Sequence, residues 1–477
     1  MKELNKKVSR RKAIKTLGLT GASFMIVPRH VLGGKGYIPP SDKLNIAGVG
    51  VGGRGAGILR AAYNKGAENI VALCDVDDVR AKSTYEAYPK AKRYKDFRKM
   101  LEQEKDIDGV MVGTPDHTHA PIAMAAMQLG KHVYVEKPLT HNLYETRLLT
   151  ETAAKYKVVT QMGNQGSSGD GVRKIQEWIA AGIIGDVRIV HCWTNRPIWP
   201  QGVPTPKGKH KIPKTLDWDL WLGPAAMRDY NPAYLPFKWR GWWDFGTGAL
   251  GDMGCHIIDP PFKALKLGYP TAVEASVGQV YVGDFRIADF QDSCPPSSKV
   301  HFEFPAREGM PPVELIWYDG GIMPRKPKEM KDNEKLSFDG GCIFEGSKGK
   351  ILCGVYGRNP TLLPTSSMQY FKQPEEMIDR VPEGHETQWV NAIKNGTSTS
   401  SSFDYAGPLT ETVLMGNLAI RSHELKVLKP GKTPSSWDPY DFPGRKRLTW
   451  DGVNMKITNF DEANAFVKRA YRKGWEL

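Results

Sequence analysis

Residues 44–55 read LNIAGVGVGGRG, a short apolar run that breaks into glycines and then into a helical pattern. In a G-x-G-x-x-G turn the first glycine makes a sharp bend, the second lets backbone N–H groups approach a pyrophosphate, and the third packs helix against strand. Two frames fit, Gly48-Gly50-Gly53 and Gly50-Gly52-Gly55, and the second leaves a full strand before the turn. Because glycines also punctuate ordinary loops, the turn predicts a nucleotide site only together with its surroundings.

A second apolar run, residues 69–74, ends in Asp75, at the distance that a beta-alpha-beta unit requires. An acidic residue at the tip of this strand accepts hydrogen bonds from the adenosine ribose and repels a 2'-phosphate. The order of strand, glycine turn, helix, strand and acid therefore favours NAD over NADP. The plain alternative is a solvated Asp at the end of a strand.

The composition fits a folded protein of two domains with a large core, since the chain has 477 residues. The net charge is +14, but residues 1–15 alone carry seven Lys/Arg against one Glu, and no long basic run follows. We therefore expect no nucleic-acid partner. The six cysteines show no C-x-x-C spacing, so no disulfide framework is implied.

The first residues resemble a twin-arginine export signal. Residues 9–15 read SRRKAIK and precede a mildly apolar segment, residues 16–27, that is too short and too rich in Gly and Thr to span a membrane. We expect a leader at residues 1–35 and a periplasmic protein without a membrane span. A disordered basic N-terminus is the alternative.

A third strand, predicted at residues 107–113, is followed by the loop TPDHTH at residues 114–119. In a doubly wound sheet ligands bind at the carboxyl ends of the strands, so this loop should flank the nicotinamide side. His117 and His119 suggest a metal site, but two histidines two residues apart without further ligands favour loop hydrogen bonding instead. We therefore predict no metal.

The strand at residues 131–135 ends in Glu136-Lys137-Pro138. The order of glycine turn, acidic tip, Thr-Pro-Asp-His loop and Glu-Lys-Pro resembles the Gfo/Idh/MocA family of glucose-fructose oxidoreductase and inositol dehydrogenase. The resemblance implies that Lys137 contacts both nicotinamide and substrate, and that Pro138 is often cis. With a strand at residues 158–162, a doubly wound parallel Rossmann domain is predicted at residues 36–163. The predicted cofactor contacts are Gly50, Gly52, Gly53, Arg54, Gly55, Asp75, Thr114, Pro115, His119, Glu136 and Lys137.

The second half, residues 164–477, predicts an α+β domain. After an amphipathic helix at residues 170–182, alternating stretches predict half-buried antiparallel strands, and residues 343–352 predict a hairpin. The resemblance implies a large, mostly antiparallel open sheet that forms a homodimer or homotetramer interface. A final helix is predicted at residues 460–472, with Asn459 and Glu462 as a capping box. The alternating stretches are residues 187–193, 271–282, 300–304 and 313–318.

Residues 246–259 read GTGALGDMGCHIID and place Asp252 and His256 four apart. On a helix this spacing puts both side chains on one face, where the carboxylate can orient an imidazole that accepts a proton. A helix cap and a packed core histidine are the bland alternatives. The resemblance implies instead a catalytic Lys, Asp and His, here Lys137, Asp252 and His256.

Residues 218–243 are unusually aromatic and interleaved with charges. Aromatic faces pack against sugar C–H surfaces while charged groups bind hydroxyls, so Trp239, Arg240 and Trp242 are predicted to bind substrate beside the catalytic residues. An oligomer contact, or an arm packed over the core, explains the same composition equally well.

The sequence thus predicts an NAD-dependent oxidoreductase that acts on CH–OH groups of a sugar, glycoside or cyclitol. A second hypothesis is an NAD-dependent glycosidase or lyase of the same superfamily, which works by transient oxidation and elimination. A third is a non-catalytic sugar-binding protein. The fold alone does not distinguish the first two.

Overall fold

The first sheet of the computed structural model has six parallel strands in the described part of the chain, residues 39 and 42–477. The predicted leader lies outside these residues. The spatial order β3-β2-β1-β4-β5-β6 reverses between β1 and β4, which is where a doubly wound sheet binds its ligand. The predicted Rossmann sheet is confirmed. Its strands are β1 (Asn45–Val49), β2 (Asn69–Cys74), β3 (Lys92–Tyr94), β4 (Gly109–Val112), β5 (His132–Val135) and β6 (Thr160–Met162).

Several helices of this half begin at side chains that accept hydrogen bonds from the first turn. Asp77 accepts from Val79 N and Arg80 N at the start of α4, and Asn142 accepts from Glu145 N at the start of α7. Such caps satisfy N–H groups that have no partner inside the helix. The elements are α3 (Arg54–Tyr63), η3 (Asn64–Gly66), α4 (Asp78–Ala87), α5 (Phe97–Gln103), η4 (Asp116–Thr118), α6 (His119–Gln128) and α7 (Leu143–Tyr156).

The second sheet has nine strands among the described residues, in the order β15-β14-β13-β7-β12-β11-β8-β18-β19. It is mostly antiparallel, as predicted, but β7 and β12 run parallel. Alternation reveals which face is buried and not the strand direction, and the long connection after β7 lets two neighbours run the same way. The strands are β7 (Val187–Thr194), β8 (Ala272–Val277), β11 (Ser298–Phe304), β12 (Val313–Tyr318), β13 (Gly340–Gly346), β14 (Lys350–Gly354), β15 (Thr361–Leu363), β18 (Leu448–Asp451) and β19 (Lys456–Ile457).

The smaller strands form two separate hairpins. The predicted stretch 271–282 divides, because β8 stays in the large sheet while the chain turns into a hairpin of its own. The hairpin strands are β9 (Tyr281–Gly283) with β10 (Arg286–Ile287), and β16 (Val427–Leu428) with β17 (Tyr440–Asp441).

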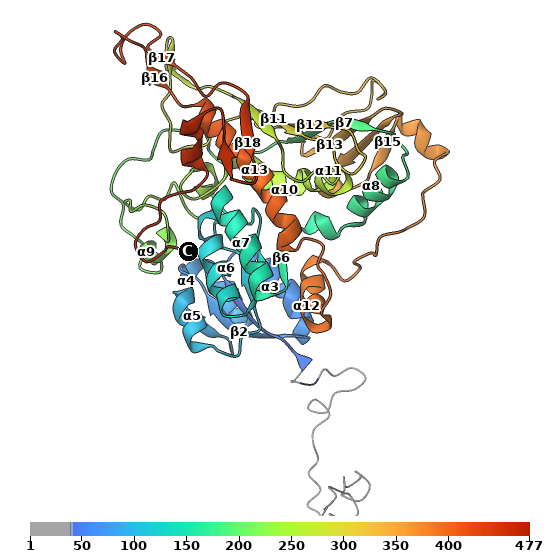
Figure 1. Ribbon diagram of the computed structural model, residues 1–477. Coiled ribbons are helices and arrows are strands. Elements are labelled where there is room, and N and C mark those ends of the chain that lie inside the picture. Colours follow the sequence, from blue (N-terminus) through green and yellow to red (C-terminus); the bar gives the residue numbers. More distant parts are fainter. Residues whose placement is uncertain (1–38, 40–41) are drawn as a thin grey trace, which may run out of the picture. The chain divides into compact units, whose positions relative to one another are not determined.

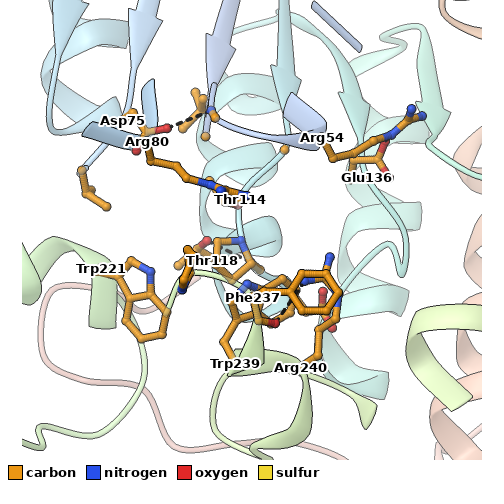
Figure 2. Close-up of a pocket in the computed structure, with 18 of the residues that line it drawn as sticks. Arg54, Asp75, Arg80, Thr114, Thr118, Glu136, Trp221, Phe237, Trp239 and Arg240 are labelled. Carbon is orange, nitrogen blue, oxygen red and sulfur yellow. Dashed lines mark hydrogen bonds and ion pairs between the residues drawn. The ribbon is translucent and has the colours of Figure 1, made fainter. Parts of the chain in front are cut away.

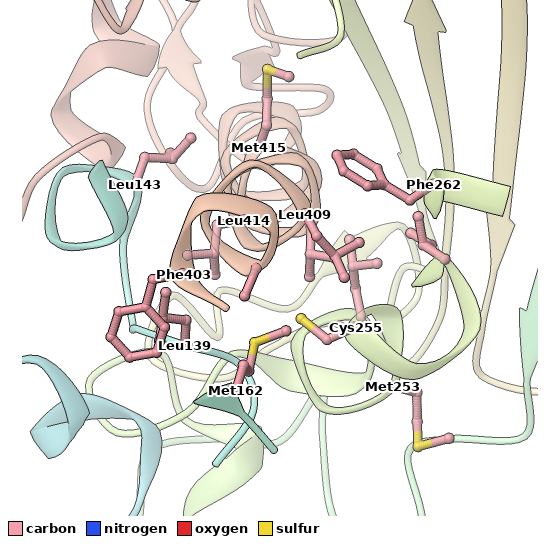
Figure 3. Close-up of a cluster of buried hydrophobic side chains, with 14 of the residues drawn as sticks. Leu139, Leu143, Met162, Met253, Cys255, Phe262, Phe403, Leu409, Leu414 and Met415 are labelled. Atoms are coloured by element: carbon pink, nitrogen blue, oxygen red, sulfur yellow. The ribbon is translucent and has the colours of Figure 1, made fainter. Parts of the chain in front are cut away.

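Helix α13 (Phe403–His423) runs through the middle of the hydrophobic core (Figure 3). It contacts α7 on one side and α10 and β8 on the other, so it joins the two sheets. Glycines allow the close approach: a Cβ on Gly254 would lie 2.8 Å from Val413, and one on Gly416 would lie 2.4 Å from Leu250. The neighbouring helices are α8 (Asp170–Ala180), α10 (Gly248–Ile257) and α11 (Asp259–Ala264).

Helix α12 (His385–Asn395) belongs to the second half of the sequence but packs on the first sheet, as Figure 1 shows. Its Trp389 is fully buried, edge-on to Tyr134 of β5. The division into residues 36–163 and 164–477 therefore separates the two sheets, while α12 crosses it. The remaining elements are η5 (Gln165–Ser168), α9 (Trp218–Leu222), η6 (Lys238–Gly241), η7 (Val355–Gly357), η8 (Thr365–Gln369) and η9 (Asp461–Phe466).

The predicted final helix at residues 460–472 is wrong. The structure has only the short helix η9 there, and Asn459 accepts from Thr449 N instead of capping a helix. The chain after residue 466 extends toward the nucleotide half, where Arg98 donates to the carbonyl oxygen of Gly474 at 3.2 Å. Arg472 also donates to the carbonyl oxygen of Gly223 at 2.8 Å. These tertiary contacts outweigh the local helical pattern.

All six cysteines are buried free thiols. Among the described residues no helix combines the length and the apolar character that a membrane crossing requires. The segment before β13 partly covers the outer face of the large sheet. Trp193 of β7 donates from Nε1 to the carbonyl oxygen of Ser337 in this segment, and the neighbouring Leu336 packs against the cluster that contains Trp193. The oligomer interface that the resemblance implies there stays a prediction.

Candidate functional site

A cavity of about 530 Å³ opens at the carboxyl ends of β1, β2, β4 and β5. Figure 2 shows its two walls. One wall comes from the nucleotide half and includes Asp75, Arg80, Arg54 and Glu136. The segment 218–243, called the aromatic arm below, faces it from the other side. The cavity therefore lies where the sheet order reverses, as expected for a doubly wound fold.

The glycine turn at the top of β1 has the geometry of the frame Gly50-Gly52-Gly55. Gly50 has a φ of 72°, and a Cβ there would lie 2.6 Å from Thr114 N. A Cβ on Gly55 would lie 1.8 Å from the carbonyl oxygen of Gly50, so helix α3 approaches the turn as only glycine permits. Gly50 and Gly52 line the cavity, whereas Gly53 and Gly55 do not. The cradle fits a dinucleotide pyrophosphate at the start of α3.

Asp75 follows β2 and holds the glycine turn in place. Its Oδ2 accepts from Val51 N at 2.8 Å and Gly52 N at 3.2 Å, and its Oδ1 accepts from Asp77 N. Burial raises the pKa of Asp75 to about 6, although these backbone N–H groups act in the opposite direction. The carboxylate also lines the cavity, where it can accept a ribose hydroxyl.

Arg54 and Glu136 form an ion pair across the mouth of the turn. Arg54 Nε lies 2.7 Å from Glu136 Oε1, and its Nη2 lies 3.1 Å from Glu386 of α12. Both Arg54 and Glu136 line the cavity, together with Thr114 and Pro115. This pair connects α3, the end of β5 and α12.

The two histidines of the TPDHTH loop are structural. His119 is fully buried, and its ring nitrogens lie 2.9 Å from the carbonyl oxygens of Pro138 and Thr114. His117 contacts the carbonyl oxygens of Phe245 and Trp221 in the same manner. Loop hydrogen bonding is thus what both imidazoles do. His119 ties the two loops together and does not line the cavity, and its predicted cofactor contact stays a prediction.

Lys137, Asp252 and Arg240 form a largely buried charge cluster. Lys137 Nζ lies 2.8 Å from Asp252 Oδ1 and also donates to the carbonyl oxygen of Asp252, while Arg240 Nε lies 3.1 Å from the same Oδ1. Burial alone would raise the pKa of Asp252, but the two cations lower it below its usual range. The peptide bond between Lys137 and Pro138 is cis. Asp252 therefore stays ionised and fixes both cations.

His256 lies on α10, as the four-residue spacing predicts, but its partner differs from the expected one. Asp252 accepts hydrogen bonds from Lys137 and Arg240. It therefore acts on His256 only through its charge, across space. Burial, followed by the charge of Lys137, lowers the pKa of His256 well below its usual range. Its Nδ1 is buried without a hydrogen-bond partner among the described residues. A neutral imidazole that lines the cavity can accept a proton.

The aromatic arm divides into a lining part and a packed part. Trp239 and Arg240 line the cavity, and the guanidinium of Arg240 lies 4.2 Å from the Trp239 ring centroid. Trp242 is only 3% exposed and packs edge-on against Tyr234 in a buried aromatic cluster. Trp242 therefore occupies a core position, and its predicted substrate contact stays a prediction.

Sequence reasoning missed several lining residues that come from distant segments. Arg80 of α4 lies beside the glycine turn, Arg196 and Trp199 follow β7, and Tyr356 of η7 stands edge-on to His256 at 4.6 Å. Trp475 comes from the C-terminal tail. None lies in a recognisable motif, and only the fold brings them to one cavity.

The C-terminal tail is anchored firmly across the far end of the cavity. Arg98 lies over the Trp475 ring at 4.4 Å and donates to the carbonyl oxygen of Gly474 at 3.2 Å. The ring centroids of Trp475 and Phe97 lie 6.0 Å apart, and Phe97 also lines the cavity beyond Asp75. This end would hold the adenosine half of a dinucleotide, since Asp75 marks the ribose position.

Fold and site together define an NAD-binding protein with a doubly wound nucleotide domain. The model of the oxidoreductase family's NAD-binding Rossmann fold matches residues 44–164, and that of its C-terminal α/β domain matches residues 172–279. The chain belongs to the Gfo/Idh/MocA family, and its cofactor is NAD.

Two curated relatives illustrate the similarity. An inositol 2-dehydrogenase of Salmonella typhimurium is 31% identical over 40% of this chain and 56% of its own length. A glycosyl hydrolase family 109 protein of Shewanella pealeana is 28% identical over 38% of this chain and 44% of its own length. The match spans about half the length of these relatives.

The solved structure of levoglucosan dehydrogenase with NADH has a TM-score of 0.53 to this chain at 17% identity. The superposition covers 79% of this chain and 98% of that structure. At this identity the similarity concerns the fold alone.

We expect NAD retention to depend on ionised Asp75. Because an ionised carboxylate accepts the ribose hydroxyls, protonation as the pH falls through about 6 should weaken NAD binding. Asp75→Asn should lower affinity about tenfold at pH 7.5 and remove the pH step. Dialysis at pH 5 and pH 7.5, followed by quantification of bound nucleotide, measures both effects. Binding of NADP as tightly as NAD would contradict this role of Asp75.

We expect Trp475→Ala to release NAD faster, on the order of tenfold, because aromatic stacking on a base contributes about 1–3 kcal/mol. The dissociation rate can be followed by exchange against isotopically labelled NAD. Trp437→Ala is the matched control, since Trp437 is 67% exposed and does not line the cavity. Equal rates in both variants would show that the tail does not cover the cofactor.

Proposed function

We propose that the protein oxidises or reduces a secondary alcohol of a sugar, glycoside or cyclitol with NAD. The observation that carries this proposal is the pairing of a neutral, unpartnered imidazole with a fixed ammonium at one end of the cavity. His256 supplies the first and Lys137 the second. An aromatic wall that includes Trp239 continues beyond them and suits the C–H faces of a sugar.

Lys137 and His256 have different roles: Lys137 holds the substrate oxygen, and His256 transfers the proton. Lys137 Nζ, fixed by Asp252, donates to the substrate oxygen and polarises it, while neutral His256 accepts the hydroxyl proton. NAD, when bound, supplies the two-electron acceptor. Gly50, Gly52 and Asp75 would hold it along the sheet edge.

An NAD-dependent glycosidase or lyase is the second candidate, favoured by the similarity to a glycosyl hydrolase family 109 protein. Transient oxidation of a ring hydroxyl acidifies the neighbouring C–H bond, which permits elimination of the aglycone before the ring is reduced again. Net reduction of nucleotide without aglycone release would support the dehydrogenase. Aglycone release without net reduction would support the glycosidase, and any turnover excludes a mere sugar-binding protein.

We expect His256→Ala and Lys137→Ala each to lower turnover by roughly two or more orders of magnitude, as for a positioned proton-transfer group. Steady-state assays with the glycosides that the unmodified protein turns over measure the loss. The amount of nucleotide that stays bound to His256→Ala shows whether this variant still folds. His210→Ala, at an exposed position, is the control. Near-normal turnover of either variant would return that residue to a structural role.

We further propose that the twin-arginine-like leader exports the protein to the periplasm. Free NAD is not expected outside the cytoplasm, so the cofactor would be loaded before export and regenerated within each catalytic cycle. A second substrate that reoxidises it, or the elimination route, would provide this closed cycle. The anchored tail beside the adenosine end supports long retention.

Protein purified without added nucleotide should therefore carry NAD or NADH in most of its sites. Denaturation, followed by absorbance and mass measurement of the released nucleotide, gives the occupancy. A preparation that is empty and turns over only with millimolar added NAD would contradict the closed cycle and leave an ordinary dehydrogenase.

A further inference from the structure

The substrate end of the cavity holds more cationic than anionic groups. Lys137 and Arg240 share the single carboxylate of Asp252. Arg196 adds another guanidinium, and its Nη1 donates to the neutral amide oxygen of Asn195. Asp339 accepts from Asn195 in turn, so that carboxylate reaches Arg196 only through the amide.

Most of the other carboxylates that line the cavity act elsewhere. Asp75, with Asp77 and Asp96, lies at the adenosine end, and Glu136 is paired with Arg54 at 2.7 Å. Asp116 is buried and accepts from Thr247 Oγ1, and its charge acts through space on Arg240 and Lys137. Two carboxylates, Asp252 and Asp116, therefore face three cations at the substrate end, and positive charge remains in excess.

Arg240 is held ready for a ligand. Its guanidinium lies 4.2 Å from the Trp239 ring centroid and 4.5 Å from that of Phe237. Only Nε and Nη1 make hydrogen bonds within the described chain, to Asp252 and to the carbonyl oxygen of Phe237. The side chain is 21% exposed, so water screens its charge poorly. A planar guanidinium suits a carboxylate, which it binds through two parallel hydrogen bonds.

We propose that the substrate is an acidic sugar and that Arg196 and Arg240 bind its carboxylate. The inference rests on the proposed function, because it takes Lys137 and His256 as the position of the reacting alcohol. The carboxylate then lies on the part of the sugar directed toward the loop after β7. A sulfate ester offers the same negative charge, and the experiment separates the two.

Matched sugar pairs test the proposal on the nucleotide-loaded protein: glucose with glucuronate, galactose with galacturonate, and mannose with mannuronate. Nucleotide reduction gives kcat/KM, and tryptophan fluorescence gives binding, since Trp199 and Trp239 line the cavity. We expect the acid of at least one pair to exceed its neutral partner about tenfold or more, as for a charged hydrogen bond. Glucose 6-sulfate is the third arm, and its preference over glucuronate would overturn the carboxylate assignment.

Arg196→Gln should reduce the ratio of acid to neutral kcat/KM about tenfold. Arg188→Gln is the matched control, because Arg188 is 63% exposed on β7 and lies outside the cavity lining. An unchanged ratio in Arg196→Gln would overturn the proposal. Loss of bound NAD from this variant, with the ratio preserved, would overturn it as well and assign Arg196 to the cofactor.

The outcomes distinguish failure of the acidic-substrate proposal from failure of the proposed oxidoreductase function. Preference for the neutral sugar in every pair would contradict the acidic substrate, while the oxidoreductase proposal would stand. Absence of both binding and nucleotide reduction with every sugar would overturn both.

Discussion

The site depends on one largely buried carboxylate that two cations share. Asp252 accepts from Lys137 of the loop after β5 and from Arg240 of η6, so the nucleotide half meets two neighbouring segments of the second half at one side chain. A buried charge left without its partner costs several kcal/mol, which makes the meeting of these segments a condition of the folded state. The same pairing keeps the imidazole of His256 free of a direct carboxylate hydrogen bond, so it remains neutral and able to accept a proton.

Helix packing fixes where that carboxylate stands. Helix α10 lies against α13 so closely that Gly254 has no room for a side chain beside Val413. The glycine-rich segment before His256 therefore serves helix packing, whereas the glycines after β1 serve the turn at the nucleotide site. Two glycine-rich stretches of similar composition thus have different physical causes. Only the stretch after β1 follows a parallel strand.

Motifs that use local geometry were predictable from the sequence. The turn at Gly50, the acid at Asp75 and the helical spacing of Asp252 and His256 each need only neighbouring residues, and the structure contains all of them. Sequence patterns do not reveal packing roles that distant contacts decide: His119 ties two loops, and Trp242 packs against Tyr234 whereas nearby Trp239 lines the cavity. The final helix was lost for the same reason, because tertiary contacts of the tail override its periodicity.

The C-terminal tail is hydrogen-bonded to the segments that wall the cavity. Arg469 donates to the carbonyl oxygen of His117, whose ring contacts the carbonyl oxygens of Trp221 and Phe245. Arg472 binds α9 on either side of Trp221, through Asp219 and the carbonyl oxygen of Gly223. Tail, TPDHTH loop and aromatic arm are therefore one hydrogen-bonded unit over the cavity. These hydrogen bonds link the three segments, which is the structural basis on which we propose that a dinucleotide is retained.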